Sequence, residues 1–201
     1  VPAVRTGASL TALTVIAKVS VSVFTPPFAV PPLSTTVHVR LPLPLASATG
    51  WIFLAAGTVN LVRLLRWYGW LTWREPLVLS LHVGYGWLAL SMLVLGCALL
   101  GIGLAKEDAV HALTTGAVGA MTLAVMTRAS LGHTGRPKHA GPATVCIYVL
   151  VILGATLRVF APGTGLPTNL VLGSAGAAWS GAYLLFALVY GPYLVRPSLD
   201  E

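Results

Sequence analysis

The stretch from Ala109 to Thr127 carries no charged side chain. At about 1.5 Å of rise per residue, a helix of this length crosses the hydrocarbon core of a bilayer. The composition favours the same environment, because only 8% of the residues are charged and 56% are hydrophobic. Soluble domains carry about 25% charged residues, which keep their surface hydrated. The sequence therefore predicts a protein whose surface faces lipid over most of its area.

Five segments are apolar enough and long enough to span a membrane, and they are Ala46–Leu65, Leu77–Ala105, Ala109–Ser130, Ala143–Ala161 and Asn169–Val195. We expect an all-α membrane protein with a bundle of about five transmembrane helices in residues 46–196 and a short tail at 197–201. Residues 1–45 are rich in proline and are predicted to form an irregular or weakly helical arm. A sixth, imperfect helix over Thr6–Val23 is the alternative.

The positive charges indicate an orientation. The arginines and lysines gather in the loops at residues 66–74 and 136–138 and after the fifth span, whereas the alternate loops hold only Lys106 and Arg158. Lysine and arginine favour the cytoplasmic side, so these loops and the C-terminus are expected there. The net charge of +7 is dispersed along the chain rather than gathered into one patch. This pattern predicts a lipid bilayer as the partner and no nucleic acid.

Small residues recur at four-residue spacing in two of the predicted spans. The stripes are Ala112, Gly116 and Ala120 in the third span and Gly173, Ala177 and Gly181 in the fifth. Such stripes let the backbones of membrane helices approach one another closely. We interpret both as helix-packing surfaces, and the alternative is the close approach of a flat cofactor.

Histidine is the residue type in this sequence that can take part in the widest range of chemistry. His111 and His133 are 22 residues apart, so on a continuous α-helix they share a face but lie about 33 Å apart. They therefore cannot bind one metal ion together, and His82 is expected to lie toward the same side as His133. A neutral imidazole can ligate haem iron or copper, but it can equally be a structural hydrogen-bond donor. His38 and His139 lie in loop-like contexts and are expected to be exposed.

An arginine and two methionines in the predicted spans can each be interpreted in two ways. Arg128 can pair with the propionates of a haem or extend to the membrane surface. Met121 and Met126 can be soft copper ligands or fill the core, and Cys97 and Cys146 are expected to behave as small buried apolar residues. All carboxylates fall outside the spans, which argues against acid catalysis by paired carboxylates. Whether the protein is an enzyme stays open.

Three blocks of the sequence resemble the C-terminal half of NnrS proteins, and they are Leu61–Pro76, Leu81–Trp87 and His111–Arg136. These proteins are bacterial polytopic inner-membrane proteins that contain haem and copper and are associated with the response to nitric oxide. The resemblance implies haem and copper as cofactors, nitric oxide or a metal-nitrosyl species as a partner, and a plasma-membrane location. It marks the positions in its distinctive motifs as candidate cofactor-binding residues: His82, His111, Arg128, His133 and Arg136. The three histidines are the candidate metal ligands.

The resemblance covers about residues 46–196, and family members are about twice as long. We therefore expect a chain that holds roughly half of such a molecule, for which the other half is a candidate partner. Two alternatives remain for its function. One is a cofactor-free membrane transporter or proton relay, since intramembrane histidine and arginine also suit that role. The other is an incomplete half-molecule without activity.

Overall fold

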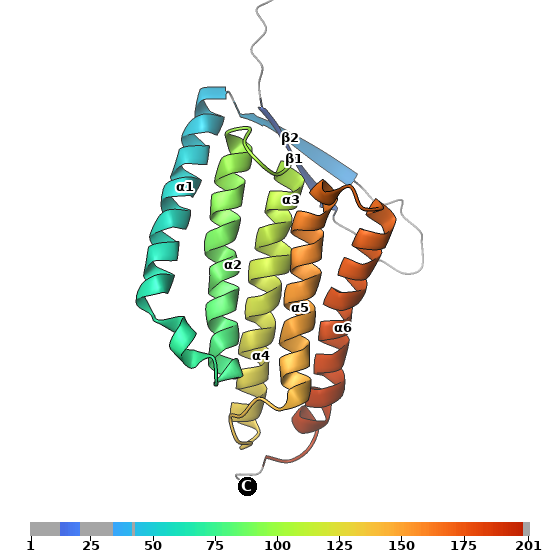
Figure 1. Cartoon of the computed structure of the whole chain (residues 1–201). Helices are drawn as coiled ribbons and strands as arrows, with labels where there is room; N and C mark the ends of the chain where they lie inside the picture. Colours follow the sequence, from blue (N-terminus) through green and yellow to red (C-terminus); the bar gives the residue numbers. More distant parts are fainter. Residues whose placement is uncertain (1–12, 21–33, 42, 199–201) are drawn as a thin grey trace, which may run out of the picture. The chain divides into compact units, whose positions relative to one another are not determined.

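A computed structural model describes residues 13–20, 34–41 and 43–198 (Figure 1). The chain divides into two units, Val1–Thr49 and Gly50–Glu201. The described strands of the first unit are β1 (Leu13–Ser20) and β2 (Ser34–Leu41). They pair antiparallel, with Leu13 opposite Leu41 and Ser20 opposite Ser34. Both strands are rich in valine, isoleucine and threonine, the residue types that favour a pleated backbone.

These strands differ from the irregular or weakly helical arm expected for residues 1–45. Leu13–Ser20 lies inside the segment considered for a sixth helix, and it is a strand. The rest of Thr6–Val23 lies outside the described residues.

The second unit is a bundle of membrane-length helices, in agreement with the all-α prediction. The helices are α1 (Leu43–Arg66, which begins in the first unit), α2 (Pro76–Leu99), α3 (Lys106–His111), α4 (Gly119–His133), α5 (Pro142–Phe160) and α6 (Thr168–Leu194). A π-helical segment, η2 (Ala112–Val118), joins α3 to α4 into one rod. Short 3₁₀ turns follow α1 at Gly69–Thr72 (η1) and α5 at Ala161–Thr164 (η3).

Five helices among the described residues are long and apolar enough to cross a membrane, as the sequence predicts. The boundaries on either side of the loop between the second and third spans differ from the expected ones. The second span ends at Leu99 instead of Ala105, because the chain turns through Gly101 and Gly103, which both have positive φ. The third begins at Lys106, so the residues Lys106–Asp108 form its first turn instead of a loop.

Side chains from α4, α5 and α6 form the main core. Leu123, Ile147, Val151 and Tyr190 are almost completely buried there. A second cluster surrounds Trp87 of α2, which packs against η2 and α5. At Gly116, an added Cβ would lie 2.3 Å from the Trp87 ring. The stripe of small residues in the third span is thus a packing surface, as predicted.

The second stripe has a different environment. Gly173 and Ala177 are exposed, and an added Cβ at Gly173 or Gly181 would meet nothing within 4 Å. Within the described bundle, this face of α6 packs against no other helix. Cys97 and Cys146 are free thiols, and Cys146 is exposed on α5 instead of buried as expected.

Candidate functional site

The five candidate residues fall into two groups at opposite ends of the third membrane helix. His111 closes α3, near the start of this helix, whereas Arg128 and His133 lie in α4, near its end. Arg136 follows in the next loop, and His82 lies in the second turn of α2. The two groups are separated by most of the length of the helix, so they are described in turn.

The π-helical segment begins directly after His111. Its wider turns release backbone carbonyls from the regular α-helical pattern. Two side chains of α6 use the carbonyls in and beside this segment: Trp179 Nε1 donates to the Thr115 carbonyl at 3.2 Å, and the Tyr183 hydroxyl donates to the Gly119 carbonyl at 3.1 Å. The regular-helix arithmetic that places His111 and His133 on one face therefore does not apply. Their separation along the helix is still too great for a shared metal ion.

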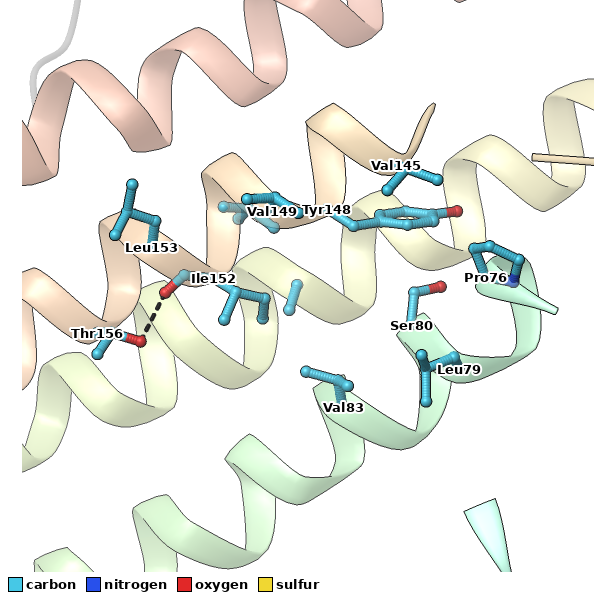
Figure 2. Close-up of a pocket in the computed structure, with 12 residues that line it drawn as sticks. Pro76, Leu79, Ser80, Val83, Val145, Tyr148, Val149, Ile152, Leu153 and Thr156 are labelled. Carbon is cyan, nitrogen blue, oxygen red and sulfur yellow. Dashed lines mark hydrogen bonds between the residues drawn. The ribbon is translucent and has the colours of Figure 1, made fainter. Parts of the chain in front are cut away.

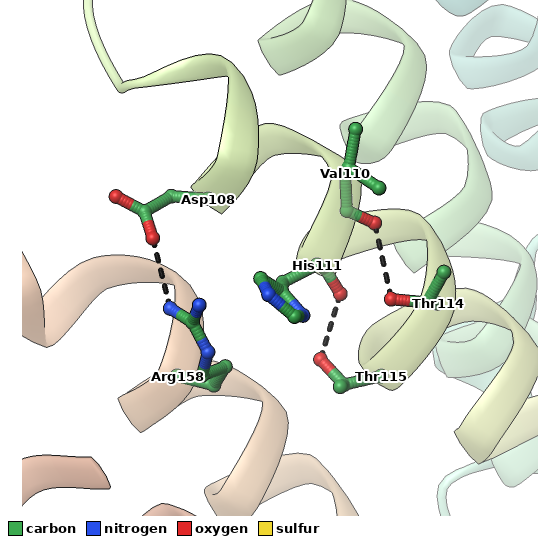
Figure 3. A network of polar contacts seen from close by, with 6 residues as sticks. All are labelled: Asp108, Val110, His111, Thr114, Thr115 and Arg158. Atoms are coloured by element: carbon green, nitrogen blue, oxygen red, sulfur yellow. Dashed lines mark hydrogen bonds and ion pairs between the residues drawn. The ribbon is translucent and has the colours of Figure 1, made fainter. Parts of the chain in front are cut away.

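The His111 side chain is partly buried and lies beside an ion pair (Figure 3). Arg158 Nη1 of α5 lies 2.8 Å from Asp108 Oδ1, one turn before His111. The Thr115 hydroxyl donates to the backbone carbonyl of His111 at 2.7 Å and not to its ring. Among the described residues, His111 Nδ1 is the buried side-chain nitrogen or oxygen that has no hydrogen-bond partner. Buried polar groups nearly always have one, so this nitrogen is available to a ligand.

Asp108→Asn is expected to lower the free energy of unfolding by about 1–3 kcal/mol, because it leaves the guanidinium of Arg158 without its carboxylate partner. Both side chains are mostly buried, with 24% and 18% exposed for Arg158 and Asp108. Thermal unfolding in detergent measures the effect, and Glu107→Gln, at an exposed neighbouring position, is the control. The double variant with Arg158→Gln should lose less than the sum of the two single losses. Additive losses would show that the pair does not contribute.

His82 has a defined tautomer. Its Nδ1 lies 3.0 Å from the carbonyl oxygen of Val78, which can only accept, so Nδ1 carries the proton. In the neutral form of this imidazole, Nε2 has the lone pair that a metal needs. The ring packs edge-on against Trp67 at 6.2 Å and against Gly69 of η1. His82 is therefore a second imidazole with a free acceptor nitrogen.

At the end of the third membrane helix opposite His111, Arg128 and His133 line a cavity of about 460 Å³. Lys138 joins them, and Leu81 of α2 forms part of the wall. Arg136 does not line this cavity: its Nη1 donates to the Thr134 carbonyl at 3.3 Å, and its guanidinium lies 4.4 Å from the centre of the Tyr193 ring. The structure thus brings Arg128 and His133 together and places Arg136 against α6.

Two further cavities are mainly apolar. One, of about 460 Å³, opens between α2, α4 and α5 (Figure 2), and the hydroxyls of Ser80 and Thr156 in its wall already donate to backbone carbonyls. The other, of about 510 Å³, is lined by Met121 and Met126 without any histidine. Neither cavity contains a candidate site residue. The described residues contain no group of three or more histidine, cysteine, aspartate or glutamate side chains placed to hold a metal ion.

The model of one protein family, described as NnrS protein, matches residues 3–198. The chain belongs to the NnrS family. Searches of curated proteins and of solved structures gave no significant match. The family match begins well before residue 46, so the NnrS pattern covers more of the chain than the three resembling blocks indicate and includes most of the N-terminal arm.

Sequence reasoning missed three residues of these two regions in the NnrS chain. Asp108 and Arg158 form the ion pair beside His111, and Lys138 lines the cationic cavity. The sequence contains a signal for Asp108, because it precedes His111 by three residues and thus shares its helix face. Arg158 is separated from Asp108 by 50 residues, and no local pattern predicts their contact.

Proposed function

We propose that this protein acts in the bacterial response to nitric oxide as a multi-pass inner-membrane protein that binds a metal cofactor, haem or copper. Membership of the NnrS family supports the role in the nitric oxide response. The five membrane-length helices support the location. The observation that carries the cofactor proposal is the buried, unpartnered Nδ1 of His111.

The residues around His111 fit haem better than a copper ion held by the chain alone. Haem iron needs only one or two axial ligands from the protein, and a single imidazole is a common one. Copper sites take several ligands from side chains, and the described residues contain no group of three or more histidine, cysteine, aspartate or glutamate side chains that could hold one. Bound haem supplies an iron atom that can bind nitric oxide. His111 is the proposed ligand, and His82 and His133 are the other candidates.

Arg158 is the proposed partner for the carboxylates of a haem bound at His111. One of its nitrogens binds Asp108, and Arg158, unlike His111, also lines a cavity of about 290 Å³ together with Thr115 and Trp179. A guanidinium has five N–H donors, so it can bind a second carboxylate while it holds the first. Arg128 lies about 25 Å further along the helix from His111, which is too far for this role.

The distribution of charge supports an orientation with the C-terminus in the cytoplasm. The turn that follows α1 and the loop that follows α4 lie at the same end of the bundle, since they are separated by two spans. They contain Arg74 and the pair Arg136 and Lys138. The loop at the opposite end, before α3, contains no cation, and Arg158 there is paired with Asp108. Positively charged loops are retained in the cytoplasm.

An optical spectrum with and without nitric oxide tests the proposal. The full chain is purified anaerobically in mild detergent, and its iron and copper contents are measured. We expect a haem spectrum that shifts when nitric oxide is added. A protein that stays colourless and metal-free after incubation with haem and with copper would contradict the proposal.

A cofactor-free proton relay is the second candidate, and one observation favours it. His111, Asp108 and Arg158 form a cluster of ionisable groups at the edge of the membrane-length helix. Such groups in membrane helices often mark proton pathways. This function predicts a proton flux in reconstituted vesicles that a His111→Gln variant abolishes, and a wild-type protein without bound metal.

A further inference from the structure

The cavity at the end of α4 combines positive charge with an apolar wall. Arg128, His133 and Lys138 supply the cationic and imidazole groups, all three on exposed side chains. The rest of the wall consists of apolar or small residues from α2 and α4: Leu81, Val125, Ala129 and Gly132. The polar groups thus lie at the end of the membrane helix, and the apolar wall extends back along it.

The end of α4 explains how Lys138 reaches this cavity. Gly135 adopts a left-handed conformation with φ of 64°, and the Arg136 N–H donates to the Leu131 carbonyl at 3.0 Å. This is the pattern of a Schellman motif, which reverses the chain after a helix. The side chain of Lys138 then returns to Gly132, where an added Cβ would lie 3.4 Å from Lys138 Cε. The charge of Lys138 is therefore positioned by the turn.

Among the described residues, no carboxylate lines the cavity. Of the acidic residues in the described part of the chain, Asp108 is paired with Arg158 at the opposite end of the helix, and Glu107 lies beside it in α3. Glu75 precedes α2 at the same end as the cavity but is not part of its wall. The positive groups of the cavity thus have no neutralising partner in its wall, and an anion fits there.

We propose that this cavity binds the phosphate group of an anionic membrane lipid. The guanidinium of Arg128 matches the geometry of a phosphate, to which it can donate two parallel hydrogen bonds. Lys138 adds a second cationic donor, and the imidazole of His133 can donate an N–H. The acyl chains lie along Leu81 and Val125. Basic cavities between membrane helices bind lipid headgroups in this manner. The site lies at the opposite end from His111, so it extends beyond the proposed function and does not depend on a cofactor.

Retention of phosphatidylglycerol by the purified full chain tests the proposal. The protein is reconstituted in phosphatidylcholine with phosphatidylglycerol, extracted in mild detergent, and its bound lipids are measured by mass spectrometry. We expect wild-type protein to retain phosphatidylglycerol in preference to phosphatidylcholine. Arg128→Gln and Lys138→Gln should each lower this retention about ten-fold, the effect of losing one hydrogen bond to a charged group. Arg66→Gln removes an exposed cation at the end of α1 and should leave retention unchanged.

A second variant keeps every charge. Gly132→Leu places an apolar side chain in the cavity wall at an exposed helix position, so it should block the lipid while the bundle still folds. It keeps the test valid if Arg128→Gln does not fold. Equal retention of phosphatidylcholine, or equal losses in Arg66→Gln and Arg128→Gln, would overturn the proposal. So would displacement of the lipid by inorganic phosphate alone, which would identify a site for the free anion. Loss of haem from Arg128→Gln would instead assign the cavity to the cofactor.

Discussion

His111→Ala should lower the haem content of the purified protein about ten-fold or more, whereas His139→Ala should leave it unchanged. The expectation follows from the position of His111, whose Nδ1 is buried without a partner beside Arg158. Loss of groups that only support a ligand lowers metal affinity 10–100-fold, and loss of the ligand itself should cost at least as much. His139 is exposed in the loop after α4. Haem extracted per mole of protein is the measurement.

Rescue by a small molecule separates ligation from folding. In a His111→Gly variant, free imidazole should restore haem binding, because it can occupy the space of the lost ring and donate the same nitrogen to iron. The unfolding temperature of the haem-free His111→Ala protein should change little, since the Nδ1 of His111 makes no hydrogen bond that the variant would lose. If His82→Ala removes the haem and His111→Ala does not, the ligand is His82, and our assignment of His111 is wrong.

The bundle could be predicted because membrane helices need a continuous apolar sequence. A bilayer offers no hydrogen bonds to the backbone, so a span must be a helix or part of a closed barrel, and its length is set by the bilayer. The packing of the helices against one another was harder to predict from the sequence. The sequence shows that residues 116 and 173 are both glycine, but only the structure shows that Trp87 packs on the first and that no described side chain lies against the second. The partner of a helix face is a tertiary property.

The candidate site was predicted only in part, for the same reason. His111 could be singled out as an ionisable group near the end of a membrane span. Its environment depends on α5 and α6, which supply Arg158 and Trp179. The π-helical segment has no sequence signature of its own. Backbone carbonyls in and directly after this segment accept hydrogen bonds from side chains 64 residues further along the chain. A pattern search within one helix cannot find such contacts.

Gly154→Ala should destabilise the bundle by about 1–3 kcal/mol, the usual cost of overpacking a close contact. An added Cβ would lie 2.8 Å from the backbone nitrogen of Trp179 and 2.9 Å from the carbonyl oxygen of Ala175. Because these are backbone atoms of α6, no side-chain rotation relieves the clash, and α5 and α6 must separate along a contact that is more extensive than any other between the described helices. Thermal unfolding in detergent is the measurement.

Gly173→Ala is the matched control, because it makes the same chemical change in α6 where an added Cβ meets nothing within 4 Å. Alanine favours a helix over glycine by about 1 kcal/mol, so this variant should be neutral or slightly more stable. The same preference acts at Gly154, so the difference in stability between the two variants measures the clash alone. If both variants shift the unfolding temperature equally, the α5–α6 contact is not as close as the structure places it. A Gly154→Leu variant should prevent the two helices from packing and lower the yield of folded protein further.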